Sequence, residues 1–384
     1  MKAINEIKKN LILNAKNVIG WKTDRKIVVF SVDDYGNVRL DSRKARNRLD
    51  DACIKVKSKF KGLDLYDSLE TRDDLTMLYD VLSSVKDKNG RYAVFTPFAV
   101  PYNINFEKIE EDGYQEYSNE LLPDTYEKLS HSQPDSYQGA WELWMEGIDK
   151  ELMIPQFHGR EHLNVNVFNE MLQKRDPSFM TILKNRSFSR LPSINHITIS
   201  PVAAFDFWNP NENKDFEYII ESGLNAFEKV FGYRAVHFNA PAGRENSMIH
   251  QYLKNNGIRY IDTPMIKKEH QGMGKYSVKF NYTGKRNSQN QLFLVRNVVF
   301  EPTREITNHG VDYSLKQIEA SFRWKRPAII SSHRVNFCGH INEENRKKGL
   351  GALKQLLSHI VKKWPDVEFF SADELGELID SESA

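Results

Sequence analysis

The stretch Phe30-Ser31-Val32-Asp33-Asp34-Tyr35-Gly36 closes an apolar run that begins at Lys26. A continuous run of β-branched and aromatic residues is typical of a buried parallel strand. The two acids at its end place two carboxylates at the rim of a sheet, where catalytic groups of α/β proteins gather. Because strand side chains alternate, Asp33 and Asp34 can share one site only if the chain turns, and Gly36 predicts that turn. The alternative is a turn acid followed by a helix N-cap.

The composition is that of a globular protein. Of 384 residues, 40% are hydrophobic and 28% are charged, and 54 basic residues balance 52 acidic ones to a net charge of +2. No overall field therefore favours nucleic acid or a membrane surface as a partner. Cys53 and Cys338 provide no disulfide framework. We find no signal peptide in residues 1–20 and no apolar run near the ~20 residues of a membrane span. A cytoplasmic protein is expected, and its oligomeric state is left open.

Strands and helices alternate along almost the whole chain. The strands are expected at residues 27–32, 92–95, 235–238, 259–262, 293–300, 328–332 and 367–370. The helices are expected at residues 71–89, 141–152, 216–231, 247–256, 314–324, 345–363 and 372–379. This alternation predicts an α/β fold with a parallel sheet, crossover helices and enough units to close a barrel.

No linker divides the chain, so a single domain over residues 1–384 is expected. Residues 98–136 carry three prolines and little periodicity. They predict a long surface loop or lid, part of an insertion at about residues 98–140.

A second cluster, Phe157-His158-Gly159-Arg160-Glu161-His162, follows another apolar run and carries two imidazoles four residues apart. On one helical turn such residues share a face. Two imidazoles and a carboxylate form a three-ligand set that suits zinc, cobalt or another borderline divalent metal. The alternative interpretation is a surface pair of histidines.

Two further strands end in polar groups. The run Ile329-Ile330-Ser331-Ser332-His333 places a histidine at a strand end, where it could protonate a leaving group near neutral pH. The run Phe238 to Gly243 is a strand that gives way to a turn and could line a pocket. Several strand ends thus supply an acid, metal ligands and a histidine to one edge of the sheet.

These segments resemble the motifs of the polysaccharide deacetylase (NodB-homology) family of carbohydrate esterases. Ser31 to Gly36 looks like the motif Thr-Phe-Asp-Asp-Gly with one inserted residue, and His158 to His162 matches His-Ser/Thr-x-x-His. Asn239 to Gly243 looks like Arg-x-Pro-x-Gly, and Ile329 to His333 resembles Leu-x-Leu-x-His. Asp262 loosely matches the acid of a further motif. The motifs occur in the family's order and span residues 31–333.

The resemblance implies a distorted (β/α)-barrel of about seven strands and a metal-dependent deacetylase. It implies Asp33 as general base, His333 as general acid, and Asp34, His158 and His162 as metal ligands. It also implies the backbone N–H of Tyr35 as an oxyanion donor. The residues expected to line or support the site are Tyr35, Asn239, Pro241, Gly243, Arg160 and Asp262.

Two positions depart from the family pattern. Asn239 stands where the family has an arginine that orients the catalytic aspartate, and Arg160 and Arg244 are candidates to substitute for it. Gly159 replaces the hydroxyl residue of the second motif. The expected substrate is an acetylated sugar or glycan precursor, and N- and O-deacetylation are not distinguished.

Two alternatives are open at this point. One is a metal-containing carbohydrate-binding barrel that has lost turnover together with the arginine. The other is a metal-free glycoside hydrolase that pairs Asp33 with Glu301 or Asp262.

Overall fold

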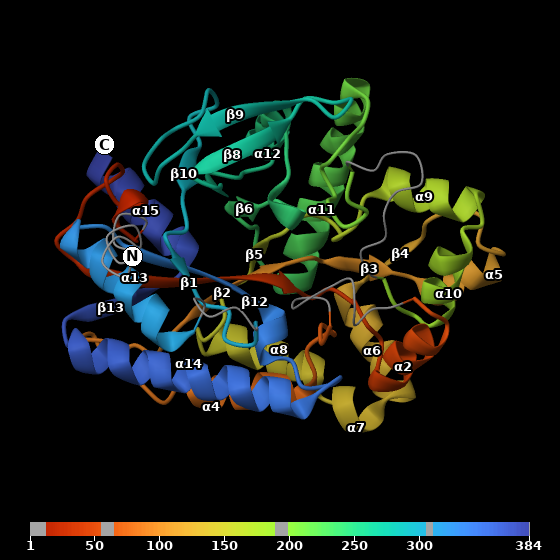
Figure 1. Ribbon diagram of the computed structural model, residues 1–384, viewed down its shortest axis with the longest axis horizontal. Helices are drawn as coiled ribbons and strands as arrows, with labels where there is room; N and C mark the ends of the chain where they lie inside the picture. Colours follow the sequence, from red (N-terminus) through yellow and green to blue (C-terminus); the bar gives the residue numbers. More distant parts are fainter. Residues whose placement is uncertain (1–12, 55–64, 189–198, 305–309, 384) are drawn as a thin grey trace, which may run out of the picture.

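The computed structural model describes residues 13–54, 65–188, 199–304 and 310–383 (Figure 1). Its strands are β1 (Lys26–Tyr35), β2 (Phe95–Ala99), β3 (Tyr102–Ile104), β4 (Asn119–Leu121), β5 (Gln156–Phe157), β6 (His237–Asn239), β7 (Tyr260–Asp262), β8 (Ile266–His270), β9 (Tyr276–Phe280), β10 (Leu292–Leu294), β11 (Val298–Val299), β12 (Ala328–His333) and β13 (Val367–Phe370). Its α-helices are α2 (Arg43–Asp51), α4 (Arg72–Leu82), α5 (Phe106–Glu111), α6 (Leu122–Ser132), α7 (Pro134–Tyr137), α8 (Ala140–Asp149), α9 (Val165–Gln173), α10 (Pro177–Lys184), α11 (Asp215–Phe231), α12 (His250–Asn255), α13 (Val311–Arg323), α14 (Glu343–Lys363) and α15 (Ala372–Ser383). Short 3-10 turns are η1 (Pro210–Lys214), η2 (Pro241–Gly243), η3 (Ser247–Ile249) and η4 (Arg334–Phe337).

Nine strands form one parallel sheet in the order β10-β7-β6-β5-β2-β1-β12-β11, and β13 pairs with β1 beside that path. Helices surround this sheet (Figure 1). The α/β fold with a distorted barrel of parallel strands is therefore confirmed.

The link between β10 and β11 shows why the sheet must curl. These strands stand at opposite ends of the eight-strand path. On a flat sheet they would lie roughly 34 Å apart, at about 4.8 Å for each neighbouring strand. Only residues 295–297 separate them in sequence, and so short a link spans at most about 14 Å. The sheet therefore curls until its two ends are neighbours, and the chain itself joins them.

Strand β1 is the centre of the sheet. Residues 28–33 pair with β12 on one side, while residues 26–29 pair with β13 and residues 30–35 with β2 on the other. The side chains of residues 27–30 are almost wholly buried, as expected for a continuous apolar strand covered on both faces. The carboxyl ends of β1, β5, β6 and β12 consequently meet at one rim.

The region expected to be a surface loop is instead built from short elements. Residues 98–136 include β3, β4, α5, α6 and α7. Pro123 and Pro134 lie in the first turns of α6 and α7, where a residue without an N–H is well tolerated. Prolines that indicate loops in the sequence thus mark helix starts in the structure.

Some predicted boundaries are wrong for local reasons. The capping box of Thr71 with Asp74 is present, but α4 ends at Leu82 instead of residue 89. Ser314 lies inside α13, where its hydroxyl donates to the carbonyl of Gly310, rather than capping that helix. The predicted strand 293–300 is two strands, β10 and β11, separated at Arg296. Within the described residues, no helix is long and apolar enough to cross a membrane.

Candidate metal centre

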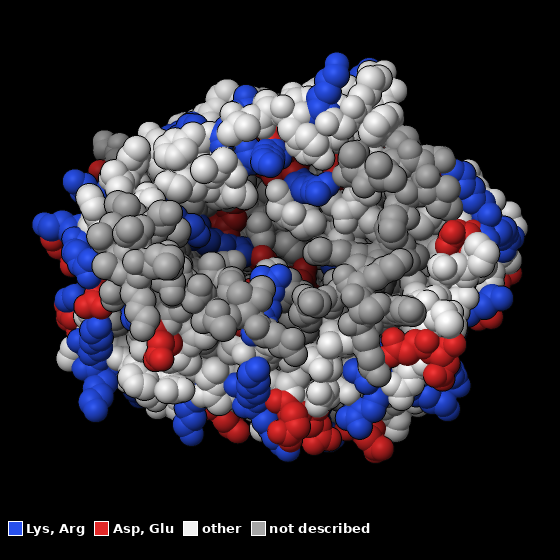
Figure 2. Space-filling model, viewed as in Figure 1, with Lys and Arg blue, Asp and Glu red and all other residues white. Residues whose placement is uncertain are grey.

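A bulge at the end of β1 brings both acids to one cavity. The pairing of β1 with β2 shifts between Val32 and Tyr35, and Asp34 has a left-handed φ of 74°. Such a bulge breaks the alternation of a strand. Asp33 and Asp34 therefore both line a cavity of about 730 Å³. The face seen in Figure 2 is hollowed near its centre, with acidic and basic atoms visible inside.

Asp34, His158 and His162 form a compact buried cluster at this rim. Their ligand atoms all lie within 4.8 Å of one another. Oδ1 of Asp34 is 2.8 Å from Nε2 of His162 and 3.6 Å from Nε2 of His158. These side chains come from two different strand ends, so the fold itself assembles the cluster.

The two histidines lie on a loop, and the expected helical turn is not present. Residues 158–164 contain no helix, and α9 begins only at Val165. Gly159 has a φ of +96°, and a Cβ there would lie 3.2 Å from a side-chain carbon of Pro241. The glycine therefore permits both the left-handed turn and the close packing on Pro241.

The contacts of His158 fit a metal ligand. Its Nδ1 lies 2.8 Å from the carbonyl oxygen of Asn239. Because a carbonyl only accepts, Nδ1 carries the proton and Nε2 presents a lone pair. That Nε2 is buried and has no hydrogen-bond partner among the described residues. A fixed tautomer with a free nitrogen facing a carboxylate and a second imidazole is the usual arrangement around a bound divalent cation.

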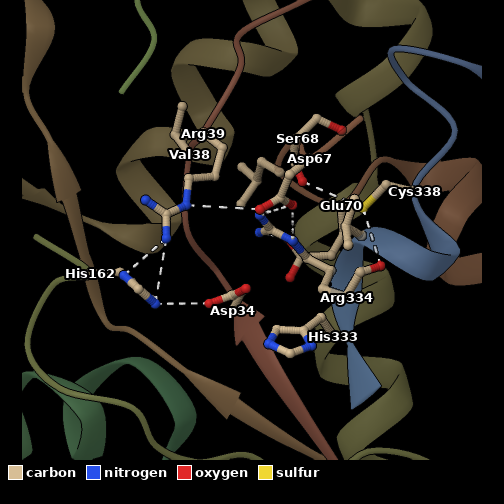
Figure 3. A network of polar contacts seen from close by, with 12 residues as sticks. Asp34, Val38, Arg39, Asp67, Ser68, Glu70, His162, His333, Arg334 and Cys338 are labelled. Carbon is tan, nitrogen blue, oxygen red and sulfur yellow. Dashed lines mark hydrogen bonds and ion pairs between the residues drawn. The ribbon is translucent and has the colours of Figure 1, made fainter. Parts of the chain in front are cut away.

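His162 is held in its neutral form. Burial and the guanidinium of Arg39 lower its pKa to about 4. Nη2 of Arg39 lies 3.0 Å from Nδ1 of His162 (Figure 3). Since arginine only donates, Nδ1 accepts, and Nε2 donates to Asp34 in this state. A cation bound at Nε2 would require the other tautomer, with the proton on Nδ1, and Nδ1 would then no longer accept from Arg39. Burial alone would raise the pKa of Asp34, but the two imidazoles hold it well below its usual value.

A buried network of ion pairs lies next to the cluster and includes Arg39, which contacts His162 (Figure 3). Nε of Arg39 lies 3.8 Å from Asp67, and Arg334 contacts Asp67 at 2.7 Å and Glu70 at 3.1 Å. Glu70 also accepts the backbone N–H of Gly36 at 2.8 Å. The network thus connects the turn after Asp34 to the end of β12, and it balances two guanidinium groups against two carboxylates.

Asp33 is held away from the cluster by Arg296. The guanidinium donates two hydrogen bonds to the carboxylate, Nη1 to Oδ2 and Nη2 to Oδ1, each 2.7 Å long. Asn239 donates a third from Nδ2 to Oδ1, also at 2.7 Å. The candidate substitutes Arg160 and Arg244 do not take this place, because Arg160 bonds to Glu161 and Arg244 to Asp206. Arg296 and Asn239 together fix the orientation of Asp33.

Arg296 is itself fixed by a second acid. Its Nε donates to Oδ2 of Asp262 at 2.6 Å, and Oδ1 of Asp262 lies 3.0 Å from Nε2 of His237. Arg296 stands on the three-residue link that closes the barrel. This role of Arg296 is not evident from the sequence, because residues 293–300 resemble one strand. The only signal was a charged residue in the middle of that apolar run.

His333 faces Asp33 from the neighbouring strand. Its Nε2 lies 4.0 Å from Oδ2 of Asp33, and its Nδ1 lies 2.5 Å from Oε1 of Glu301. Burial alone would lower the pKa of His333, but the Glu301 carboxylate outweighs it and raises that pKa to about 10. Asn336 donates to the other oxygen of Glu301 at 2.7 Å. His333 is therefore a protonated imidazole at neutral pH, next to the cavity.

The other predicted site residues divide into two groups. Gly243 and Asp262 line the cavity together with Asn239. In contrast, the ring of Tyr35 is buried against Trp144, so a role for this residue is restricted to its backbone.

Comparisons with known proteins show similarity in structure only. No protein-family model matches the chain, and no curated protein matches it significantly. A protein of Mycobacterium smegmatis assigned as a polysaccharide deacetylase aligns over 95% of this chain and 94% of its own, with a TM-score of 0.44 and 13% identity. PuuE allantoinase aligns over 93% and 91%, with a TM-score of 0.45 and 9% identity. The 4-alpha-glucanotransferase of Thermococcus litoralis aligns over 91% of this chain and 40% of its own, with a TM-score of 0.44 and 10% identity.

Proposed function

We propose that this protein is a metal-dependent hydrolase that removes an acetyl or related acyl group from a carbohydrate. One observation carries the proposal: an Asp-His-His cluster lies beside a second aspartate that is kept out of the cluster by Arg296. The two adjacent carboxylates would then have separate roles, with Asp34 as a metal ligand and Asp33 as the base. His333 on the neighbouring strand supplies the acid.

The chemistry follows from the positions of these groups. A divalent ion held by Asp34, His158 and His162 would polarise the acyl carbonyl and activate a water molecule. Asp33, fixed by Arg296 and Asn239, accepts the proton of the attacking water. Protonated His333 donates a proton to the departing amine or alkoxide. The site contains a candidate for each proton transfer that hydrolysis of an amide or ester requires.

The alternative functions lose their support in this geometry. The binding-barrel hypothesis depended on the missing arginine, and Arg296 fills that role. A metal-free glycoside hydrolase needs a second carboxyl group that lines the cavity and can serve as the acid. Glu301 does not line the cavity. Burial alone would raise the pKa of Asp262, but Arg296 and His237 lower it, so this carboxyl stays ionised.

Asp33→Asn is expected to retain bound metal and to lose turnover by about 10²- to 10⁴-fold, the usual contribution of a general base. The amide keeps the shape of the side chain but cannot take the proton. Metal content per chain and acetate release from a panel of N- and O-acetylated sugars measure the two effects. Asp24→Asn, a change at an exposed acid, is the control. Undiminished acetate release by Asp33→Asn would remove Asp33 as the base.

Glu301→Gln is expected to move the alkaline limb of the pH–rate profile to lower pH. In the wild type, Glu301 holds the pKa of His333 at about 10, so the acid form persists through neutral pH. Without that carboxylate, burial lowers the pKa, and activity falls as the pH rises through the new value. The measurement is kcat/KM against pH, with the exposed Glu344→Gln as control. An unchanged profile contradicts the assignment of His333.

The same ion pair links stability to pH. Because folding raises the pKa of His333, its contribution to the free energy of unfolding is complete below about pH 6.5, the pKa of free histidine. That contribution is lost as the pH rises through about 10.

A further inference from the structure

A two-stranded hairpin beside the cavity has its apolar side turned outward. Strands β8 and β9 pair antiparallel, with Ile266 opposite Phe280, Lys268 opposite Val278, and His270 opposite Tyr276. Residues that stand opposite each other share a face of the sheet. The alternation Tyr276-Ser277-Val278-Lys279-Phe280 would place three apolar side chains in a core. In the structure these side chains face solvent.

The exposure of this face is large and local. Ile266 is 63% exposed, Tyr276 44%, Val278 69% and Phe280 45%, and Met273 in the connecting turn is 59% exposed. These five are among only twelve large apolar side chains exposed in the described part of the chain. Contiguous apolar surface of this kind marks an interaction site.

The inner face of the hairpin is polar and fixes this orientation. Lys267 is buried, forms an ion pair with Glu245, and lies 3.3 Å from Glu269. Glu269 also accepts from Ser247 at 3.1 Å. Turning the apolar side chains inward would expose this ion-paired network and break its contacts. The apolar face therefore points outward because the ion pairs of Lys267 on the opposite face of the hairpin are buried beneath it.

The charged residues of the hairpin segment itself are almost all of one sign. Residues 264–286 contain five lysines and one arginine but a single acid, Glu269, which is buried under the hairpin. Lys268, Lys275 and Lys279 are exposed. They form no ion pair with any described residue. Exposed apolar and aromatic side chains among unpaired lysines are the composition of a surface that binds the interface of an anionic bilayer.

We propose that the outer face of the β8–β9 hairpin docks the protein on an anionic lipid surface. Charge complementarity decides the occupant. A twofold contact with a second copy would bring the same lysines of both chains together, whereas lipid phosphates neutralise them. The chain's net charge of +2 does not indicate this surface. Basic residues outnumber acidic ones in the hairpin segment but not in the rest of the chain.

The position of the hairpin gives the docking a consequence for the cavity. Met265 and Ile266 line the cavity that holds Asp33 and Asp34, and the hairpin follows directly after β7, whose last residue is Asp262. Docking through this face would bring the lipid surface close to one wall of the cavity. Membrane binding itself does not depend on the reaction proposed above.

Sedimentation of the full chain with vesicles tests the proposal. The wild type is expected to sediment with vesicles of phosphatidylcholine and phosphatidylglycerol, and much less with phosphatidylcholine alone. Val278→Ser/Phe280→Ser should weaken partitioning about tenfold or more through loss of apolar insertion. Lys268→Glu/Lys275→Glu should do the same through charge. Metal content and melting temperature should stay unchanged, since all four side chains are exposed.

A matched control is Met77→Ser/Tyr92→Ser, which removes apolar side chains that are also partly exposed but are not in the hairpin. Met77 lies on α4, at the bottom of Figure 1, whereas the hairpin lies at the top. This control should bind vesicles as the wild type does. A wild type that remains in the supernatant, or hairpin variants that sediment as it does, would overturn the proposal. A wild-type dimer that Val278→Ser/Phe280→Ser converts to a monomer would also overturn it, in favour of a second copy.

Discussion

His158→Ala and His162→Ala are each expected to purify without the divalent metal that we propose for the wild type. Each change leaves two of three protein ligands in a buried site. The lost affinity should exceed the roughly 10- to 100-fold that removal of an outer-shell partner costs. Elemental analysis of the purified chains, and titration of the metal-depleted chains with Zn²⁺ and Co²⁺, measure content and affinity directly. Acetate release should fall with the metal content.

The control for these variants is His250→Ala, because His250 is equally buried but contacts Glu245 instead of the cluster. It should retain the full metal content. The Asp33→Asn variant separates ligand from base, since it should keep the metal and lose turnover. Normal metal occupancy in both His158→Ala and His162→Ala would reject the ligand set, whatever their activity.

The residues at the strand ends could be predicted from the sequence because the carboxyl ends of parallel strands lie at the same rim of a sheet. Continuous apolar runs predicted β1 and β12, and the polar residues after them must lie at the same rim. The rule brought Asp33, Asp34 and His333 to one place without any knowledge of the strand order. It also placed the histidines after β5, although their loop geometry depends on the close approach of Gly159 to Pro241.

Arg296 could not be found in the same way. Its partners Asp33 and Asp262 lie 263 and 34 residues away in the sequence. Its position depends on the curl that makes neighbours of β10 and β11. A run of eight residues with one arginine resembles a single strand. Only the complete sheet order shows that the chain changes there from one end of the sheet to the other.

The β8–β9 hairpin is absent from the strands expected from the sequence, although Tyr276 to Phe280 alternates apolar and polar residues. Such alternation is typical of a strand whose apolar face is buried. The face is exposed because Glu245, a partner outside the hairpin, pairs with Lys267 beneath it. Which side of a two-sided strand faces inward is decided by such tertiary contacts.

Arg296→Ala is expected to destabilise the protein and to lose most of its turnover. Removal of the guanidinium leaves the carboxylates of Asp33 and Asp262 close together without their shared cation. Loss of one partner of a buried ion pair costs about 3–5 kcal/mol. Denaturant unfolding measures that free energy. Turnover should fall because Asp33 loses two of its three hydrogen bonds and is free to turn toward Asp34 and its cluster.

Arg296→Lys tests whether charge alone is sufficient. A lysine ammonium can neutralise the two acids, but it cannot form the two parallel hydrogen bonds to Asp33 while bonding to Asp262. We therefore expect stability between that of the wild type and of Arg296→Ala, with turnover still strongly reduced and metal content retained. Arg259→Ala, which removes an exposed ion pair with Glu377, should change unfolding by no more than about 1 kcal/mol. Wild-type turnover in folded, metal-loaded Arg296→Lys or Arg296→Ala would show that Asp33 needs no arginine. In that case the closure of the barrel at Arg296 would serve stability alone.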